Sequence, residues 1–353
     1  MTNNASSIFI FISFVTAAVF LTLGCESPTG ENGDKTGTID LYCFSEALGD
    51  PSQITEGYQL YSLVQVSPEI NDTTLIQTDA QGYTQLKAVP EGSYTFTPLH
   101  AADSYAKSVT VTAGQTEQVE LPTPLSGIYM YMFDTESTSP PFDDIQVRQA
   151  LAMSLVRNDL VTSLEEDNDL DLSTDLSLTN TIQPGGSFIP SVLASDDWTY
   201  DSVAEDISTA ESYLIDTNAF DFTLHYNSDA SNSNFHDDMA DHVIAQWGAL
   251  SKIGIITQTS EPMSSYITNV GSAIADMWAA WWYLDSNNLY LYFEAIFNGD
   301  IFMDIDDAEF ETHLENVGNA INDQDIDTYE QEIIEVNNRL IELMPAVPLL
   351  CFE

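Results

Sequence analysis

The chain has 353 residues, of which 44% are hydrophobic, and this is enough for a sizeable core in about two domains. Only seven Lys and Arg stand against 56 Asp and Glu, which gives a formal net charge of −49 although charged residues make up 18% of the chain. The hydrophobic content excludes a disordered acidic chain, and the shortage of basic residues argues against nucleic acid as a partner, because phosphate contacts need Lys and Arg.

The acidic surface leads to a hypothesis about the working environment. Few carboxylates find a basic partner within a Debye length, so like charges repel one another in dilute buffer. We therefore expect a halophilic protein that concentrated salt stabilises by screening this repulsion.

The N-terminus carries an apolar run, 8-IFIFISFVTAAVFLTLGCESPTG-30. The run is short, lies close to the start and ends in small residues, as a signal peptide does. Residues 21–25, LTLGC, resemble the lipobox of bacterial lipoproteins. The resemblance implies a signal peptide over residues 1–25 with Cys25 as the lipidation site; the alternative is an uncleaved membrane anchor. Both predict an extracytoplasmic, membrane-anchored protein, on the periplasmic side or at the cell surface.

The remaining cysteines, Cys43 and Cys351, lie near the two ends of the mature chain. They could form a disulfide in an oxidising compartment, and two buried thiols are an equally good interpretation. Neither has the neighbouring Cys and His that a metal site or a nucleophile needs. We predict no metal site and no cofactor.

Residues 26–36 are polar and rich in turn-forming residues, and they predict a tether. Between 37 and 121, short runs of aromatic, β-branched and alternating residues are separated by turns, which is typical of a small all-β sandwich. Strands are expected at 38–44, 57–66, 73–78, 93–99, 108–112 and 116–121.

Two turns within this segment follow a specific pattern, 78-TDAQGYTQLKAVPEGSYTF-96. Asp79 to Gly82 and Pro90 to Gly92 are both predicted to join strands, with glycine supplying the backbone conformation that such turns need. The pattern resembles the carboxypeptidase-regulatory-like, or prealbumin-like, family. The resemblance implies a β-sandwich that acts as a spacer or interaction module without catalytic residues.

After a break at 122–126, residues 127–353 alternate helix and strand patterns, which indicates an α/β layer structure. The first helix is predicted from PPFDDIQVRQALAMSLVR (140–157), with Asp143 as its N-cap. Its apolar residues point in nearly every direction, so we expect it to be buried. Further helices are predicted at 201–215, from Met239 to a C-terminal cap at Gly254, and from Ile326 to Leu340, with strands at 221–226, 255–259 and 346–352.

Two of the three arginines, Arg148 and Arg157, lie in this first helix. Nine steps of about 100° place them on opposite sides of it. A buried guanidinium needs a carboxylate or carbonyl partner, so the prediction is a structural ion pair on each flank. Direct contact with a ligand is the alternative.

The order of several motifs matches one family. The segment 129-YMYMFDTESTSPPFDDIQVRQALAMSLVRNDLV-161 is followed by 200-YDSVAEDISTAESYLI-215, 241-DHVIAQWGALSKIGI-255 and 342-ELMPAVPLL-350. Together they resemble the C-terminal half of the family 5 extracellular solute-binding proteins, the peptide- and nickel-type receptors of ABC transporters. The resemblance implies an α/β lobe of the type II periplasmic-binding-protein kind, and no enzyme.

The same resemblance points to a ligand-binding segment, 274-IADMWAAWWYLDSNN-288. It implies that Trp282 and Asp285 lie at the ligand cleft, where an aromatic wall beside a carboxylate suits an amino group. Three tryptophans in five residues also suit a plain core or an interface.

An acidic run at 167–175 places oxygen ligands at alternating positions. Leu172 and Leu178 replace the glycine and glutamate of a calcium loop, so a solvated loop is the prediction. No nucleophile elbow, phosphate loop or zinc signature is present in the sequence.

The sequence thus predicts a lipoprotein that binds a small solute, by resemblance a peptide, for ABC-type transport, with a transporter permease as a possible partner. The alternative is a structural or interaction lipoprotein built on a truncated solute-binding lobe.

Overall fold

The computed structural model describes residues 35–45, 59–67, 73–99, 106–123, 126–166, 182–190, 193–194, 198–228, 233–270, 275–284, 287–299 and 303–352. Cys25, most of the predicted tether, the acidic run at 167–175 and Asp285 lie outside these residues. From Lys35 onward the chain forms one compact unit, and the predicted division of it at 122–126 stays a prediction. In the described part of the chain, no helix has the length and apolarity needed to cross a membrane.

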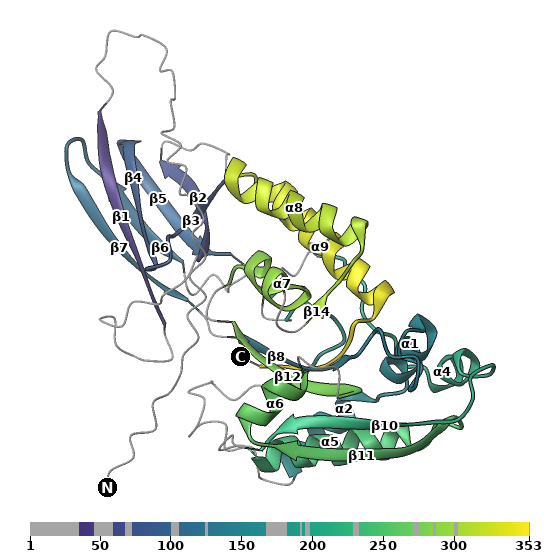
Figure 1. Ribbon diagram of the computed structural model, residues 1–353. Coiled ribbons are helices and arrows are strands. Elements are labelled where there is room, and N and C mark those ends of the chain that lie inside the picture. The colour runs from purple at the N-terminus through teal and green to yellow at the C-terminus, as the bar shows by residue number, and fades with distance from the viewer. Residues whose placement is uncertain are drawn as a thin grey trace, which may run out of the picture. The chain divides into compact units, whose positions relative to one another are not determined.

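Seven strands come first in the chain and form two sheets (Figure 1). They are β1 (Thr36–Ser45), β2 (Leu60–Ser67), β3 (Thr73–Gln77), β4 (Tyr83–Pro90), β5 (Gly92–Pro98), β6 (Lys107–Val111) and β7 (Thr116–Thr123). The sheet orders are β4-β1-β7 and β3-β2-β5-β6. Buried residues of both sheets, such as Leu41 and Phe96, share one cluster. The strands expected in this segment are therefore present.

The turn at Asp79–Gly82 has the predicted conformation. The Asp79 carboxylate accepts hydrogen bonds from the N–H groups of Gln81, at 3.0 Å, and Tyr83, at 2.9 Å. Gly82 has a φ of 69°, which glycine adopts without steric cost. The tight turn then leads straight into β4.

From Ser126 onward, the described residues form a six-stranded sheet with helices on both faces. The strands are β8 (Ser126–Phe133), β9 (Ile182–Pro184), β10 (Phe220–Asn227), β11 (Ile253–Glu261), β12 (Met277–Leu284) and β15 (Ala346–Phe352), in the order β11-β10-β12-β8-β15-β9. The helices are α1 (Ile145–Met153), α2 (Arg157–Glu166), α4 (Ile207–Tyr213), α5 (Ser233–Trp247), α6 (Met263–Val270), α7 (Leu289–Phe297), α8 (Ala308–Asp323) and α9 (Ile326–Leu343), and a small hairpin comprises β13 (Asn298–Gly299) and β14 (Met303–Asp304).

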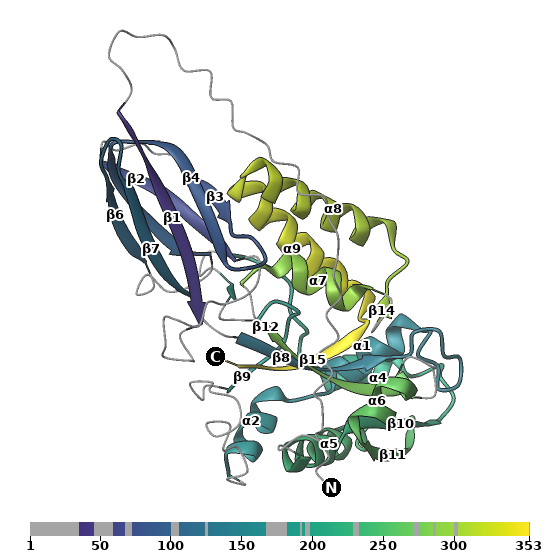
Figure 2. The same ribbon diagram turned by 60° about the vertical axis from the view of Figure 1, so that its left-hand side comes forward.

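The central strand β8 shows how the layers are built, since all eight of its residues are buried. Tyr129 and Tyr131 point into a first core cluster with α1, α2, α4 and α5. Met130 and Met132 point into a second cluster with α7, α8 and α9. Figure 1 shows the latter helices on one side of the sheet, and Figure 2 shows α2 and α5 on the other. Because alternating side chains of a strand face opposite ways, this apolar strand is buried on both faces and lies in the middle of three layers. This agrees with the predicted α/β layer structure.

The prediction of one helix carrying both arginines was wrong. Helix α1 ends at Met153, and Arg157 begins α2. The Leu151 carbonyl accepts from the hydroxyl of Ser154 and from the indole N–H of Trp247, both at 2.9 Å. These partners end the helix locally, and a tryptophan from a distant helix cannot be read from the local periodicity.

Three predicted helix ends were also wrong. The N-cap of α1 is Asp144, whose side chain accepts from the Gln146 N–H, and not Asp143. Helix α4 starts only after its N-cap Asp206. Gly254 lies inside β11 and does not cap α5; a Cβ there would overlap the Asp221 carboxylate, which accepts from the Ile255 N–H at 2.6 Å. A side chain at this position would have to displace the Asp221 carboxylate, whereas the backbone of Gly254 is not left-handed.

Candidate functional site at the carboxyl edge of the sheet

The carboxyl ends of four strands lie at one edge of the six-stranded sheet. Strands β11 and β12 run parallel to β10, and β12 and β15 are both antiparallel to β8. The chain leaves β10 through α5, which packs in the first core cluster, and leaves β11 through α6, whose Tyr266 packs in the second. In open α/β sheets this change of side creates a crevice at the carboxyl edge, where ligands bind.

Trp282 lies near the carboxyl end of β12, opposite Ile128 of β8. It is partly buried and packs against the second core cluster. Asp285 follows three residues later and lies outside the described residues, so the pairing of the two side chains at a ligand stays a prediction.

The other two tryptophans of this segment belong to the core. Trp278 is 4% exposed in the second cluster. Trp281 packs against the first cluster and stacks on Phe352, with ring centroids 4.8 Å apart and planes 6° apart. Trp282 is likewise packed against a core cluster, so its candidacy for ligand contact rests on the motif and on its place near the end of β12.

A polar cluster at the ends of β10 and β11 was not predicted. His225 is buried, with Nδ1 3.5 Å from the Glu261 carboxylate. Glu261 also accepts from the Asn269 amide, at 2.7 and 2.6 Å. The one feature of the sequence that could have indicated this cluster is that His225 and Glu261 both lie near the ends of apolar runs. The cluster offers a carboxylate and an imidazole at the edge where the crevice is expected.

A second buried histidine lies behind Trp281. His236, near the start of α5, shares a 3.0 Å hydrogen bond with the Tyr129 hydroxyl. Burial lowers the pKa of His236 to about 4, against a smaller opposing effect of Asp237. The neutral imidazole is therefore the form that this part of the core holds at neutral pH.

Arg148 joins α1 to the end of α9. Its guanidinium donates to the carbonyls of Met344, at 2.8 Å, Phe142, at 2.6 Å, and Leu343, at 2.5 Å. Burial lowers its pKa, and Asp144 acts on it as the leading charge in the opposite sense. Two of the partners, Leu343 and Met344, are the last carbonyls of α9, where a cation is favourable. They lie just before β15, at the edge opposite the carboxyl ends of the four strands. The third partner, Phe142, precedes α1.

Arg157 is 1% exposed and ties α1 to β15. Its guanidinium donates to the carbonyls of Pro348, at 2.9 Å, and Ala152, at 3.2 Å. Glu205 forms an ion pair with it at 4.0 Å, and burial lowers the Arg157 pKa to about 10. Both arginines thus bond mainly to backbone carbonyls. Their positions therefore give no support to ligand contact by either arginine.

Asn287 connects the candidate segment to the first strands of the chain. It is 1% exposed, and its side chain accepts from the Leu60 N–H at 2.8 Å. Its amide donates to the carbonyls of Leu60, at 2.7 Å, and Leu99, at 3.1 Å, and its own N–H donates to the Gln59 side chain at 3.2 Å. The seven-stranded part and the α/β part are therefore joined two residues beyond Asp285.

The two cysteines are buried and form no disulfide. Cys43 accepts a hydrogen bond from the Tyr61 hydroxyl at 2.8 Å. Burial raises the pKa of Cys43 to about 12, so it stays a neutral thiol.

Several solved structures share this fold. The unliganded open form of MppA, a periplasmic murein tripeptide binding protein, matches with a TM-score of 0.50 and 20% identity. The match covers 65% of this chain and 42% of MppA. A peptide-binding protein of a peptide ABC transporter matches with a TM-score of 0.51 and 15% identity, over 65% of this chain and all of the other. HbpA2 from Haemophilus parasuis matches with a TM-score of 0.51 and 14% identity, over 64% of this chain and 42% of the other. The chain thus spans less than half the length of two of these proteins.

No curated protein matches the sequence. The family model "Bacterial extracellular solute-binding proteins, family 5 Middle" matches residues 84–303, which is more than half of the chain. The match begins within β4 and ends at β14. The motifs from PPFDD to the Trp282 segment all lie inside it. The chain therefore belongs to the bacterial extracellular solute-binding proteins, family 5.

Proposed function

We propose that the protein captures a small solute, a peptide, outside the cytoplasm and delivers it to the permease of an ABC-type importer. The observation that carries the proposal is the position of Trp282 on a family 5 lobe, at the edge where the carboxyl ends of four strands meet. A binding role at this edge agrees with the general behaviour of open α/β sheets. Binding, not catalysis, is the activity we assign.

In this proposal Trp282 forms an aromatic wall and Asp285 receives the ammonium group of the peptide. An ammonium beside an indole face gains cation–π attraction, and a carboxylate adds a charge-assisted hydrogen bond. The net charge of −49 also raises the local concentration of cationic ligands, an effect that salt screens.

Lipidation at Cys25 would hold the protein at the membrane, and the strands from β1 to β7 would serve as a prealbumin-like spacer. Mass spectrometry of the N-terminal peptide from membrane extracts tests the anchor. A diacylglycerol-modified Cys25 supports it, and an intact residue 1 supports the uncleaved anchor.

A second candidate function is favoured by the contact at Asn287. Leu60 of β2, Leu75 of β3 and Leu99 just after β5 join the same core cluster as α7, α8 and α9. The first part of the chain thus covers apolar surface of these helices. A docking protein built on the family lobe would have its early strands packed against the lobe in this way.

Equilibrium dialysis separates the two functions. The purified protein is dialysed in molar salt against a peptide pool, and mass spectrometry identifies what it retains. We expect peptides to be retained and to be lost on Asp285→Ala, with Glu315→Ala, an exposed site on α8, as the control. If the wild type retains no peptide at any salt concentration, solute capture is wrong and the docking function remains.

A further inference from the structure

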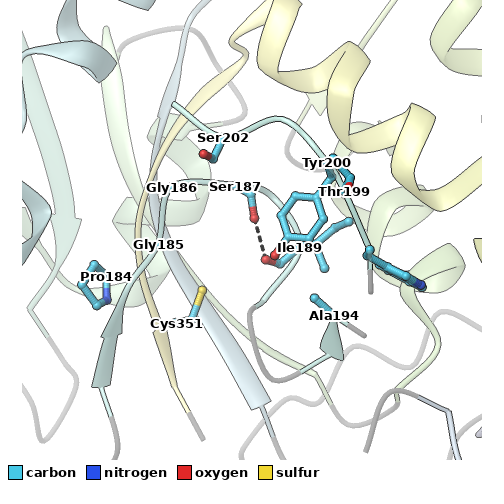
Figure 3. Close-up of a pocket in the computed structure, with 11 residues that line it drawn as sticks. Pro184, Gly185, Gly186, Ser187, Ile189, Ala194, Thr199, Tyr200, Ser202 and Cys351 are labelled. Atoms are coloured by element: carbon cyan, nitrogen blue, oxygen red, sulfur yellow. Dashed lines mark hydrogen bonds between the residues drawn. The ribbon is translucent and has the colours of Figure 1, made fainter. Parts of the chain in front are cut away.

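A pocket of about 550 Å³ lies beside the short edge strand β9 (Figure 3). One wall is the loop from Pro184 to Ile189, the other is the segment from Trp198 to Ser202, and Cys351 of β15 lies between them. Figure 3 shows the side chains of Tyr200 and Cys351 between the two walls. The volume is in the range of small-molecule binding sites, about 300–1,000 Å³.

The pocket is separate from the Trp282 segment. Trp282 and Cys351 both pair with Ile128, one from each side of β8, so the three residues form one row across the sheet. Two strand spacings put the ends of this row roughly 10 Å apart. Ile128 between them is fully buried, so packed core separates the two places.

Asn337 of α9 holds both walls in place. It is fully buried, and its side-chain oxygen accepts from the Phe188 N–H at 2.9 Å. Its amide donates to the Asp201 carbonyl, also at 2.9 Å. One buried amide thus fixes a backbone group in each wall, and the Val203 N–H adds a 2.7 Å bond to the Gly186 carbonyl. The pocket is therefore preformed, which spares a ligand the cost of ordering it.

The lining is uncharged. Among the described residues that line the pocket none is Asp, Glu, Lys or Arg, although the chain has 56 acidic residues; Asp201 belongs to the second wall but is exposed and is not one of the lining residues. It offers hydroxyls, two aromatic rings and a thiol; the hydroxyl of Ser187 donates to the Ile189 carbonyl at 2.7 Å. Burial raises the pKa of Tyr200, which keeps its hydroxyl neutral. A charged ligand would find no counter-charge among the described lining residues, and losing water without one is costly.

We infer that this pocket is a second binding site, for a small uncharged ligand with a ring-sized apolar body and hydroxyl or amide groups. Asn337 is its positioning residue. Aromatic rings supply apolar contact area and the hydroxyls orient the ligand. The site does not depend on Trp282 or Asp285.

The test is a set of matched triplets, each an amide with the acid and the amine on the same skeleton, such as 4-hydroxyphenylacetamide, 4-hydroxyphenylacetate and tyramine. Affinities are measured by saturation-transfer NMR in molar salt. The decisive comparison is amide against amine, because molar salt screens the attraction of the net charge for the amine and the difference then reports the chemistry of the pocket. We expect at least one amide to bind tenfold or more tightly than its amine.

Two variants place the binding in the pocket. The atom nearest to a Cβ at Gly186 is Ser202 Cβ, at 3.5 Å, which is ordinary van der Waals contact. Gly186→Ala should therefore keep binding, and Gly186→Trp should fill the pocket and abolish it. Ser202→Trp should also block the pocket, from an exposed position at its rim. It serves as the second variant if Gly186→Trp fails to fold.

Asn337→Leu tests the positioning role. It should weaken amide binding at least tenfold while retention of peptides that depends on Asp285 is unchanged. If every amide binds no better than its amine, or if amide binding survives both Gly186→Trp and Ser202→Trp, the inference is wrong. Peptide retention is measured separately, so this failure is distinct from a failure of the proposed function.

Discussion

Replacing Arg148 by methionine tests the assignment of this arginine as a structural brace. Methionine keeps most of the apolar volume but removes all three hydrogen bonds to carbonyl oxygens. The Met344 and Phe142 bonds are buried, and the Leu343 bond is partly buried, so water can replace only the last. Two buried carbonyls left without a partner cost about 1–3 kcal/mol each, or about 2–6 kcal/mol together.

The expected loss lies in the lower half of that range, since removing the guanidinium also removes the cost of burying it. Domains of this kind have about 5–15 kcal/mol of stability in total, so the loss is easily measured. The assay is urea unfolding at constant salt, followed by tryptophan fluorescence.

Lys87→Met is the control. It also replaces a cation by methionine, but Lys87 is exposed on β4, where a charge contributes about 0–1 kcal/mol. The brace assignment predicts a clearly larger loss for Arg148→Met. Equal losses in the two variants would refute it, and unchanged stability with lost solute binding would make Arg148 a ligand contact instead.

Three further predictions follow from the charges and the buried polar groups. The melting temperature should rise between low and molar salt, since salt screens the repulsion within a chain of net charge −49; a flat or falling curve contradicts this. The folded-state pKa of His236, about 4, lies below its ordinary 6.5, so the unfolded chain binds the proton first, and stability should fall as pH drops from 6.5 towards 4. In His236→Gln this part of the urea-unfolding profile should be flatter, and identical slopes would show that another group is responsible. Asn287→Leu removes the acceptor of the Leu60 N–H and a donor to the Leu99 carbonyl, while the Leu60 carbonyl keeps its bond from the Leu99 N–H. It should speed hydrogen exchange in β2 by at least tenfold, with β10 as the internal reference; unchanged exchange in β2 would exclude Asn287 as the link between the two parts.

Much of the fold could be predicted because its signals are local. Alternation and turn residues placed the early strands, and Gly82 has the positive φ that its turn pattern required. The final helix begins at Ile326 as predicted and ends at Leu343, just before Pro345, because proline cannot continue a helix. The family was recognised from the order of motifs, and the family match over residues 84–303 confirms it.

The candidate sites were harder to predict because distant segments make them. Trp282 could be named from a motif, but its place at the carboxyl edge depends on the direction of neighbouring strands. The cluster of His225, Glu261 and Asn269 joins two strands and a helix, and no spacing in the sequence relates them. The pocket beside Cys351 had no signal at all, since its walls are held by Asn337, more than 130 residues further along the chain.

The sequence by itself determined the α/β class of the larger part, the family, and the acidic character of the surface, because periodicity, motif order and charge are properties of the chain. Only the tertiary structure decided where PPFDDIQVRQALAMSLVR breaks. Trp247 and Ser154 bond to the Leu151 carbonyl, and the Arg157 guanidinium bonds to the Ala152 carbonyl, where one continuous helix would have its own hydrogen bonds. Buried backbone groups must be paired, and long-range partners settle which pairing a given turn adopts.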